Sequence, residues 1–147
     1  MRAVAELKRV KINRISNHRE EARSDLVISE AEVVIELNGE VYRTLYCLPT
    51  HLEELARGHL ISKGICCSSD IKGVEVKQDG DRFTIAVTTA RGSPAKVVSA
   101  SSQAKITVAE IWEAVKRLDE NSILFRKSGG THVAGVCSQQ SCIFIED

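Results

Sequence analysis

Apolar and polar residues alternate over Glu30–Tyr46 with the period of two that is typical of β-strands. Asn38-Gly39 interrupts this alternation, and that dipeptide favours the two-residue turn of a hairpin because both residues tolerate a positive φ. A second alternation, over Ile71–Lys77 and Arg82–Thr88, flanks Asp79-Gly80-Asp81 in the same way. The pattern predicts two β-hairpins.

The segment between these hairpins has the period of a helix. Pro49 ends the preceding strand, and Thr50 with Glu53 has the spacing of a capping box. Gly64 suits the left-handed residue that ends a helix. We therefore expect a helix over Thr50–Lys63, with its apolar face formed by Leu52, Leu55, Ala56 and Leu60.

Residues 91–104 separate the two halves of the chain. Their sequence, RGSPAKVVSASSQA, is rich in small residues and predicts a connection with at most one short strand. Beyond it, Thr107 and Glu110 form a second capping box ahead of an apolar stripe, which predicts a helix to about Glu120. We expect an α+β fold, with an N-terminal hairpin–helix–hairpin subdomain and its linker at 1–104 and a C-terminal subdomain at 105–147.

Composition and charge exclude several classes of function. Twenty Lys and Arg balance twenty Asp and Glu, so nothing favours nucleic acid as a partner. Basic residues that alternate with apolar ones over Lys8–Arg23 predict a solvated strand face. No apolar run approaches the roughly 20 residues of a membrane span, and the first residues lack the apolar core of a signal peptide. We expect a cytoplasmic protein.

The cysteine count is odd, and the spacing is not that of a disulfide framework, so we expect mostly free thiols. No CxxC pair is present, which disfavours a zinc site. Cys137 is expected to pack inside an apolar strand, although a redox pair with Cys142 across a strand–turn–strand is the alternative. Adjacent Cys66 and Cys67 are expected in a more exposed loop. The five cysteines are Cys47, Cys66, Cys67, Cys137 and Cys142.

The segment FRKSGGTHVA, residues 125–134, places two glycines, a hydroxyl and an imidazole ahead of an apolar strand at Val133–Cys137. A polar turn and a last strand at Cys142–Ile145 follow. Successive glycines allow backbone N–H groups to converge on an anion, which indicates a ligand site. The alternative, favoured by residue chemistry alone, is a tight turn in which His132 binds a backbone carbonyl.

Two separated blocks carry a recognisable pattern. In Glu30–Ile65, EAEVVIELNG is followed by LPTHLEELARGHLISKGI. In the second block, LFRKSGGTHVAGV precedes the acidic Ile145-Glu146-Asp147. Both blocks, in this order, resemble the FdhD family of accessory sulfurtransferases that prepare formate dehydrogenases. The resemblance covers most of the chain from about Asp25 and implies that 105–147 is part of a deaminase-like α/β subdomain.

The resemblance also implies a cofactor site and partners. The family's proposed ligand is the molybdenum–guanine dinucleotide cofactor, and its partners are formate dehydrogenase and a cysteine desulfurase. Backbone N–H groups of the two glycines would meet the diphosphate, the hydroxyl and imidazole would add polar contacts, and the acidic pair would organise the loop. The candidate binding residues are therefore Gly129, Gly130, Thr131, His132, Glu146 and Asp147.

Two departures from the family leave the activity open. Sulfur-transferring members carry a CGxCG-type loop where this chain has VVSASSQA, residues 97–104, and a serine hydroxyl cannot hold transferable sulfur. No catalytic residue is therefore assigned. The family's acidic motif continues into Val-Gly-Arg-His-Asn-Ala, whereas this sequence stops at Asp147, so we expect a companion chain to complete the pocket or no pocket to form.

Three functions remain. The first is sulfur transfer to, or handling of, the molybdenum cofactor, impaired by loss of the cysteine loop. The second is a non-catalytic relative that binds the cofactor, the dehydrogenase or the desulfurase. The third is a degenerate or split product that folds as a homodimer without activity, which the sequence end at Asp147 favours. A companion chain is favoured by a different feature, because an unfinished sheet exposes an edge that can pair.

Overall fold

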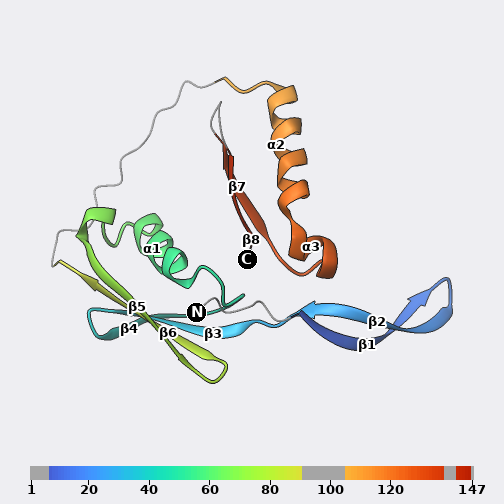
Figure 1. Cartoon of the computed structure of the whole chain (residues 1–147), viewed down its shortest axis with the longest axis horizontal. Coiled ribbons are helices and arrows are strands. Elements are labelled where there is room, and N and C mark those ends of the chain that lie inside the picture. The colour runs from blue at the N-terminus through green and yellow to red at the C-terminus, as the bar shows by residue number, and fades with distance from the viewer. Residues whose placement is uncertain (1–6, 91–104, 138–141, 147) are drawn as a thin grey trace. The chain divides into compact units, whose positions relative to one another are not determined.

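The structure is a computed structural model that describes residues 7–90, 105–137 and 142–146 (Figure 1). The predicted linker at 91–104 and the candidate residue Asp147 lie outside these described residues. Strands and helices are mixed along the chain, as expected for an α+β fold.

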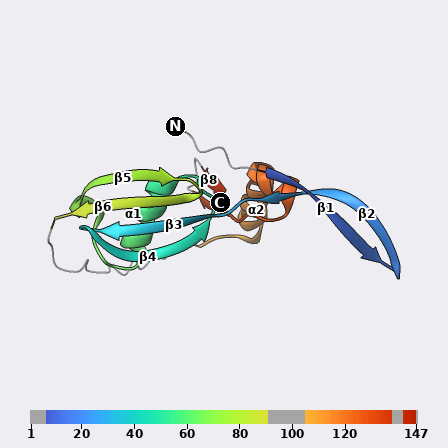
Figure 2. The ribbon, with the colours of Figure 1, turned by 90° about the horizontal axis from the view of Figure 1, so that it is seen from below.

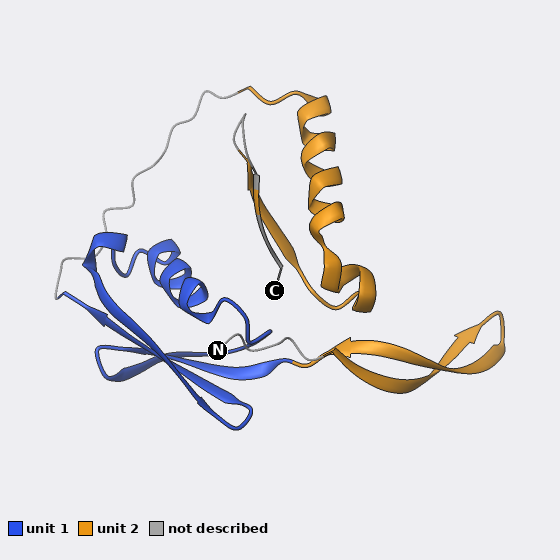
Figure 3. Ribbon diagram, in the orientation of Figure 1, with its two compact units in different colours: residues 1–4, 30–101 blue, residues 5–29, 102–147 orange. Residues whose placement is uncertain are grey.

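The chain divides into two compact units (Figure 3). Unit 1 consists of residues 1–4 and 30–101, and unit 2 consists of residues 5–29 and 102–147. The N-terminal segment 5–29 therefore groups with the C-terminal part of the chain.

Unit 1 is built on a four-stranded mixed sheet with the strand order β4-β3-β6-β5. Strands β3 (Ala31–Leu37) and β4 (Glu40–Cys47) form one antiparallel hairpin, and β5 (Ile71–Asp79) and β6 (Arg82–Thr89) form the other. The two hairpins join through β3 and β6, which run parallel. Both predicted hairpins are confirmed.

The Asn-Gly turn of the first hairpin also ties the two hairpins together. Asn38 and Gly39 have φ values of 52° and 87°, the positive values that this turn requires. The Asn38 N–H donates to the Val87 carbonyl at 2.9 Å, and the Thr89 N–H donates to the Asn38 side-chain oxygen at 2.9 Å. Asn38 thus forms the turn of the first hairpin and also links that hairpin to β6 of the second.

Helix α1 (Leu52–Ser62) lies against one face of the sheet of unit 1 (Figure 2). The predicted helix is confirmed, and Gly64 has the expected left-handed φ of 68°. The predicted cap is wrong: the N-cap is His51, in a left-handed conformation and without a side-chain hydrogen bond. The Thr50 N–H donates to the Leu48 carbonyl at 2.8 Å, and this turn leaves Thr50 one residue before the cap.

The core of unit 1 forms between α1 and the sheet. Apolar residues of β3 and β6 alternate toward the helix, and a short 3-10 helix η1 (Ser68–Asp70) leads back into β5. The side chains with no exposed surface include Val33, Ile35, Ala56, Leu60 and Ile85. Burial of these side chains is the main stabilising contribution to unit 1.

Unit 2 begins with a ten-pair antiparallel hairpin of β1 (Leu7–Ser16) and β2 (Arg19–Ile28). The predicted solvated strand is confirmed, since most of its residues are exposed. The return strand was not predicted. Its turn signal is Asn17-His18, two residues with positive φ (50° and 61°) and no glycine to mark them.

Unit 2 continues with helices α2 (Val108–Asn121) and α3 (Ile123–Ser128) and the hairpin of β7 (Val133–Cys137) and β8 (Cys142–Glu146). The capping box that begins α2 and both terminal strands are confirmed. Helix α3 was missed, because six residues are too few to show a helical period.

The described residues of unit 2 bury little apolar surface. The two buried side chains among them, Ser122 and Thr131, are polar. Large apolar side chains of α2, β7 and β8 are exposed instead: Val108, Ile111, Trp112, Val115, Val136 and Ile143. Unit 2 therefore presents an open apolar surface.

Candidate functional site

The loop with the sequence Gly-Gly-Thr-His connects α3 to β7. Gly129 is the C-cap of α3, with a left-handed φ of 67°, and its N–H donates to the Phe125 carbonyl at 2.6 Å. Glycine adopts this conformation without the steric cost that a Cβ adds. Gly129 therefore ends a helix, and its N–H is used within the chain.

The second glycine is also engaged within the chain. The Gly130 N–H donates to the Ser128 hydroxyl oxygen at 3.2 Å, and that hydroxyl in turn donates to the Leu124 carbonyl at 2.9 Å. A Cβ added to Gly130 would lie 3.7 Å from Cγ1 of Ile28, which is ordinary van der Waals contact with β2. Ser128 and the two glycines thus form a helix-ending turn that packs on the first hairpin of unit 2.

The remaining loop residues differ in access to solvent. The Thr131 side chain is buried, so its hydroxyl faces the interior of the unit. His132 is exposed and directly precedes β7. Of these two residues, His132 is the one that a ligand in solution can reach.

The β7–β8 register brings Glu146 close to the loop. Val133, the residue after His132, lies opposite Glu146 in the antiparallel ladder. The structure therefore gathers five of the six candidate residues in one region of the backbone, whereas Asp147 lies outside the described residues.

Electrostatics at the loop bear on the proposed diphosphate ligand. The loop follows the C-terminus of α3, and the carbonyl end of a helix carries partial negative charge that disfavours anions. Arg126 and Lys127 lie in the last turn; the Arg126 guanidinium donates to the Glu120 carbonyl at 3.1 Å, and Lys127 is exposed. The glycine N–H groups do not fit a diphosphate cradle in this arrangement. Lys127 and His132 are exposed polar side chains that an anion can reach here.

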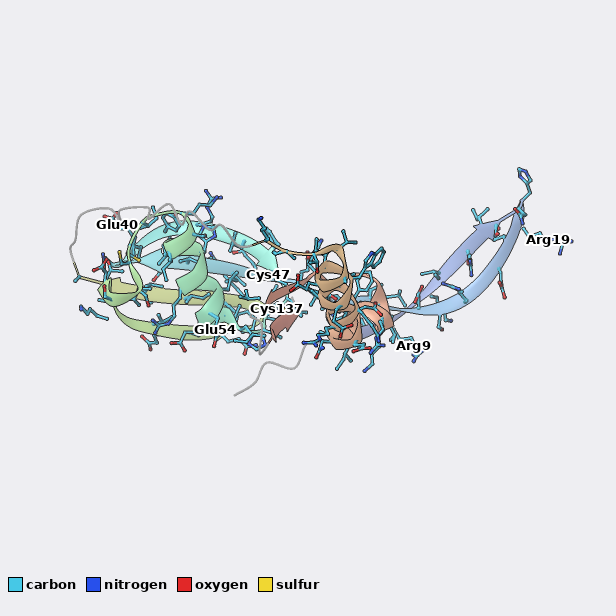
Figure 4. The ribbon with its side chains drawn as sticks, turned by 90° about the horizontal axis from the view of Figure 1, so that it is seen from above. Arg9, Arg19, Glu40, Cys47, Glu54 and Cys137 are labelled. Atoms are coloured by element: carbon cyan, nitrogen blue, oxygen red, sulfur yellow. The ribbon has the colours of Figure 1, made fainter. Side chains whose placement is uncertain are left out.

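A surface hollow of about 610 Å³ lies at the tip of the β1–β2 hairpin, where Figure 4 labels Arg19. Both basic and acidic side chains line it, and no residue of the Gly-Gly-Thr-His loop does. The hollow and the candidate loop are therefore separate features. The lining residues are Arg14, Ser16, Asn17, Arg19 and Glu21.

Two adjacent cysteines of unit 1 differ in their exposure to solvent. Cys66 and Cys67 are free thiols; Cys66 is buried and Cys67 is exposed. Burial, followed by the nearby Asp70 carboxylate, raises the pKa of the Cys66 thiol. The expectation that both cysteines are exposed is thus confirmed for Cys67 and wrong for Cys66, because Cys66 completes the core under α1.

The cysteines of unit 2 lie at the end of the last hairpin. Cys137 is disulfide-bonded and exposed, and the residue opposite it in the β7–β8 register is Cys142. The expectation that Cys137 packs in a core is wrong, because unit 2 provides no apolar layer over this end of β7 among the described residues. The predicted strand–turn–strand does bring the two cysteine positions face to face.

The described residues meet the requirements neither of a metal site nor of a membrane-spanning helix. No group of three or more His, Cys, Asp and Glu side chains there is arranged to hold a metal ion. No helix within 7–90, 105–137 and 142–146 is both long and apolar enough to cross a membrane.

Comparison with known proteins relates the chain to a family. Residues 28–97 match the FdhD/NarQ family. The chain is 31% identical, over an alignment 166 positions long with its gaps, to the sulfur carrier protein FdhD of Geobacillus kaustophilus; the alignment covers 94% of this chain and 62% of the relative. The chain is distantly related to the FdhD/NarQ family. It is 28% identical to the sulfur carrier protein FdhD of Listeria innocua, over 80% of this chain and 56% of the relative.

A solved structure shows the same fold. A Desulfotalea psychrophila protein described as a formate dehydrogenase accessory protein superposes with a TM-score of 0.77, over 95% of this chain and 61% of that one, at 20% identity. This chain therefore spans less than two thirds of the length of these relatives.

The family alignment includes the candidate loop. Because 94% of the 147 residues are covered, the uncovered 6% is about nine residues, too few to reach residues 129–132 from either end. The sequence identified these residues, but it did not reveal Ser128 or Ile28, which shape the loop. Ser128 had a recognisable signal, since a serine just before a helix-ending glycine commonly bonds backbone groups.

Proposed function

We propose that this FdhD-related chain handles sulfur for the molybdenum cofactor of a formate dehydrogenase. The observation that carries the proposal is the alignment with sulfur carrier proteins over 94% of the chain, which includes the Gly-Gly-Thr-His loop. By the same relationship, the enzyme served is a formate dehydrogenase and the sulfur donor is a cysteine desulfurase.

Within this proposal the loop residues have separate roles. His132 and Lys127 each contact an anionic part of the cofactor, because both side chains are exposed and can donate hydrogen bonds. Gly129 and Gly130 shape the turn, and Thr131 anchors it inside the unit. Glu146 and Asp147 are proposed to organise the loop from the β8 side. When bound, the cofactor would supply the metal centre that accepts sulfur.

A second function, binding without sulfur transfer, is favoured by one sequence observation. Residues 97–104 read VVSASSQA, so the CGxCG-type cysteines of sulfur-transferring relatives have no equivalent there. In this alternative the chain binds the cofactor, the dehydrogenase or the desulfurase. A deaminase-like topology for the complete C-terminal subdomain is proposed under either function.

The experiment that separates these functions is persulfide detection on the full chain. The protein is incubated with a cysteine desulfurase and cysteine, alkylated, digested and analysed by mass spectrometry. Sulfur handling predicts one added sulfur atom on a cysteine-containing peptide, and none when cysteine is omitted. A relative that retains its CGxCG loop is the positive control. If that relative is loaded and this chain gains neither an added sulfur atom nor a new disulfide, the chain acts without carrying sulfur.

The open surface of unit 2 supports a partner as well. Trp112 and Ile111 on α2 and the cross-strand pair Val136 and Ile143 on the last hairpin are exposed apolar side chains. About 38% of the Geobacillus relative lies outside the alignment, since 62% of it is covered. We propose that a polypeptide equivalent to this unmatched part covers the surface, because α2 and a two-stranded hairpin bury too little apolar area by themselves.

A further inference from the structure

The last hairpin of unit 2 holds a second chemical feature besides the loop. Cys137 ends β7, and Cys142 begins β8 directly opposite it. Opposed residues in an antiparallel ladder have Cα atoms about 4.5–5.5 Å apart. Disulfides form at Cα separations of about 4.4–6.8 Å. The register therefore places the two residues within bonding range, and Cys137 is disulfide-bonded.

We propose that Cys137 and Cys142 form a reversible dithiol–disulfide couple that, when reduced, takes sulfane sulfur from a persulfide donor and releases it as sulfide. The assignment rests on the proposed sulfur-handling function. Within that function, Cys137 and Cys142 are the site, a persulfide is the substrate and sulfide is the product.

The reaction has two steps. The Cys137 thiolate attacks the outer sulfur of a persulfide RSSH, so an S–S bond forms on Cys137 and the donor leaves as the thiol RSH. The Cys142 thiolate then attacks Sγ of Cys137, which closes the protein disulfide and expels sulfide. The sulfane sulfur gains two electrons and the two thiols lose two, with their protons appearing in hydrogen sulfide. An external dithiol, itself oxidised to a disulfide, returns the couple to its reduced form.

The ladder favours the second step. Four further pairs, from Val133 opposite Glu146 to Val136 opposite Ile143, hold β7 and β8 together when the disulfide is open. Cys137 and Cys142 are also separated by only four residues of the sequence, so attack within the hairpin is faster than attack by a thiol from solution. The Cys142 thiolate thus attacks a persulfide formed on Cys137 before that persulfide accumulates.

Exposure also distinguishes this pair from the other cysteines. Figure 4 labels Cys137 on β7, where its side chain is exposed to a donor in solution. In unit 1, Cys67 is exposed but its neighbour Cys66 is buried, with a pKa raised by that burial. A persulfide on Cys67 would have no reactive thiolate beside it and would remain in place. Cys67 therefore serves as the internal control.

The test uses the full chain and a small donor. The protein is reduced with a dithiol, desalted and mixed with glutathione persulfide; released sulfide is measured, and alkylation with mass spectrometry maps the cysteines. We expect one sulfide per disulfide formed, with the disulfide joining Cys137 to Cys142. Cys142→Ser should accumulate persulfide on Cys137 and release sulfide at least about ten-fold more slowly, because the intramolecular step is lost. The matched control Cys67→Ser should behave as the unaltered chain does.

Sulfide release that is unchanged in Cys137→Ser and in Cys142→Ser would overturn the couple, provided both variants keep the circular dichroism of the unaltered chain. So would a disulfide that a dithiol does not open. No desulfurase is present in this test, so its outcome is independent of loading by a desulfurase. Persulfide that a desulfurase places on Cys67 while Cys137 and Cys142 both remain reduced thiols would keep the proposed function and overturn the couple.

Discussion

Unit 1 and unit 2 are of similar secondary-structure content but differ in how they bury apolar side chains. In unit 1 the sheet and α1 close around residues such as Ile35 and Leu60, which have no exposed surface. In unit 2 the described residues bury only polar side chains, and Trp112 of α2 is 69% exposed. The candidate chemistry, the loop and the cysteine pair, lies in the open unit.

The difference shows how this chain is organised. Unit 1 has the features of a self-sufficient scaffold, with two hairpins joined by a parallel strand pair under one helix. Unit 2 places functional groups on a two-stranded hairpin, an element that is marginally stable without a covering layer. The well-packed core and the proposed chemistry therefore lie in different parts of the chain.

The largest expected effect compares the same substitution in the two units. Ile35→Ala, at a fully buried position, should lower the free energy of unfolding of unit 1 by about 2–5 kcal/mol, because it removes packed methyl groups and leaves a cavity. Ile143→Ala, at a position 68% exposed, should change stability by less than about 0.5 kcal/mol. Urea denaturation monitored by circular dichroism measures both.

Equal losses of unfolding free energy for Ile35→Ala and Ile143→Ala would contradict the difference between the two units, because they would mean that Ile143 is buried in solution. A loss for Ile143→Ala that appears only at high protein concentration would instead show that copies of the chain cover the open surface of one another.

A smaller loss of stability is expected from substitution of the glycines in the loop. Gly129→Ala should destabilise the α3–β7 segment by about 1–2 kcal/mol, because a side chain at a φ of 67° is strained. Gly130→Ala should have little effect, since its Cβ would meet Ile28 at an ordinary 3.7 Å. Amide hydrogen exchange of residues 123–137 reports both. The opposite order would mean that Gly130, and not Gly129, carries the conformational requirement of the loop.

Much of unit 1 could be predicted from sequence because its signals are local. The Asn38-Gly39 turn fixes one hairpin, and alternation identifies buried residues such as Val33 and Ile35. The cap of α1 could not be predicted, because the turn made by Leu48 and Thr50 depends on how β4 meets the core.

Unit 2 was less predictable for physical reasons. The turn of β1–β2 uses Asn17-His18, which has no glycine, and α3 is shorter than two helical turns. At the candidate site the sequence identified the loop residues but not their hydrogen bonds. The Gly129 N–H donates to the Phe125 carbonyl and the Gly130 N–H donates to the Ser128 hydroxyl, contacts that the sequence pattern did not specify.

The measurement that tests the division into a closed and an open unit most directly is the fluorescence of Trp112, the single tryptophan of the chain. The part of the Geobacillus relative that lies outside the alignment is added as a separate polypeptide. We predict a blue shift that saturates, because a covering layer removes water from the exposed indole. Val136→Asp, on the open surface, should weaken binding at least about ten-fold, whereas Val41→Asp, at an exposed position of unit 1, should not. No shift at any concentration of the segment, or equal weakening by both variants, would contradict the account.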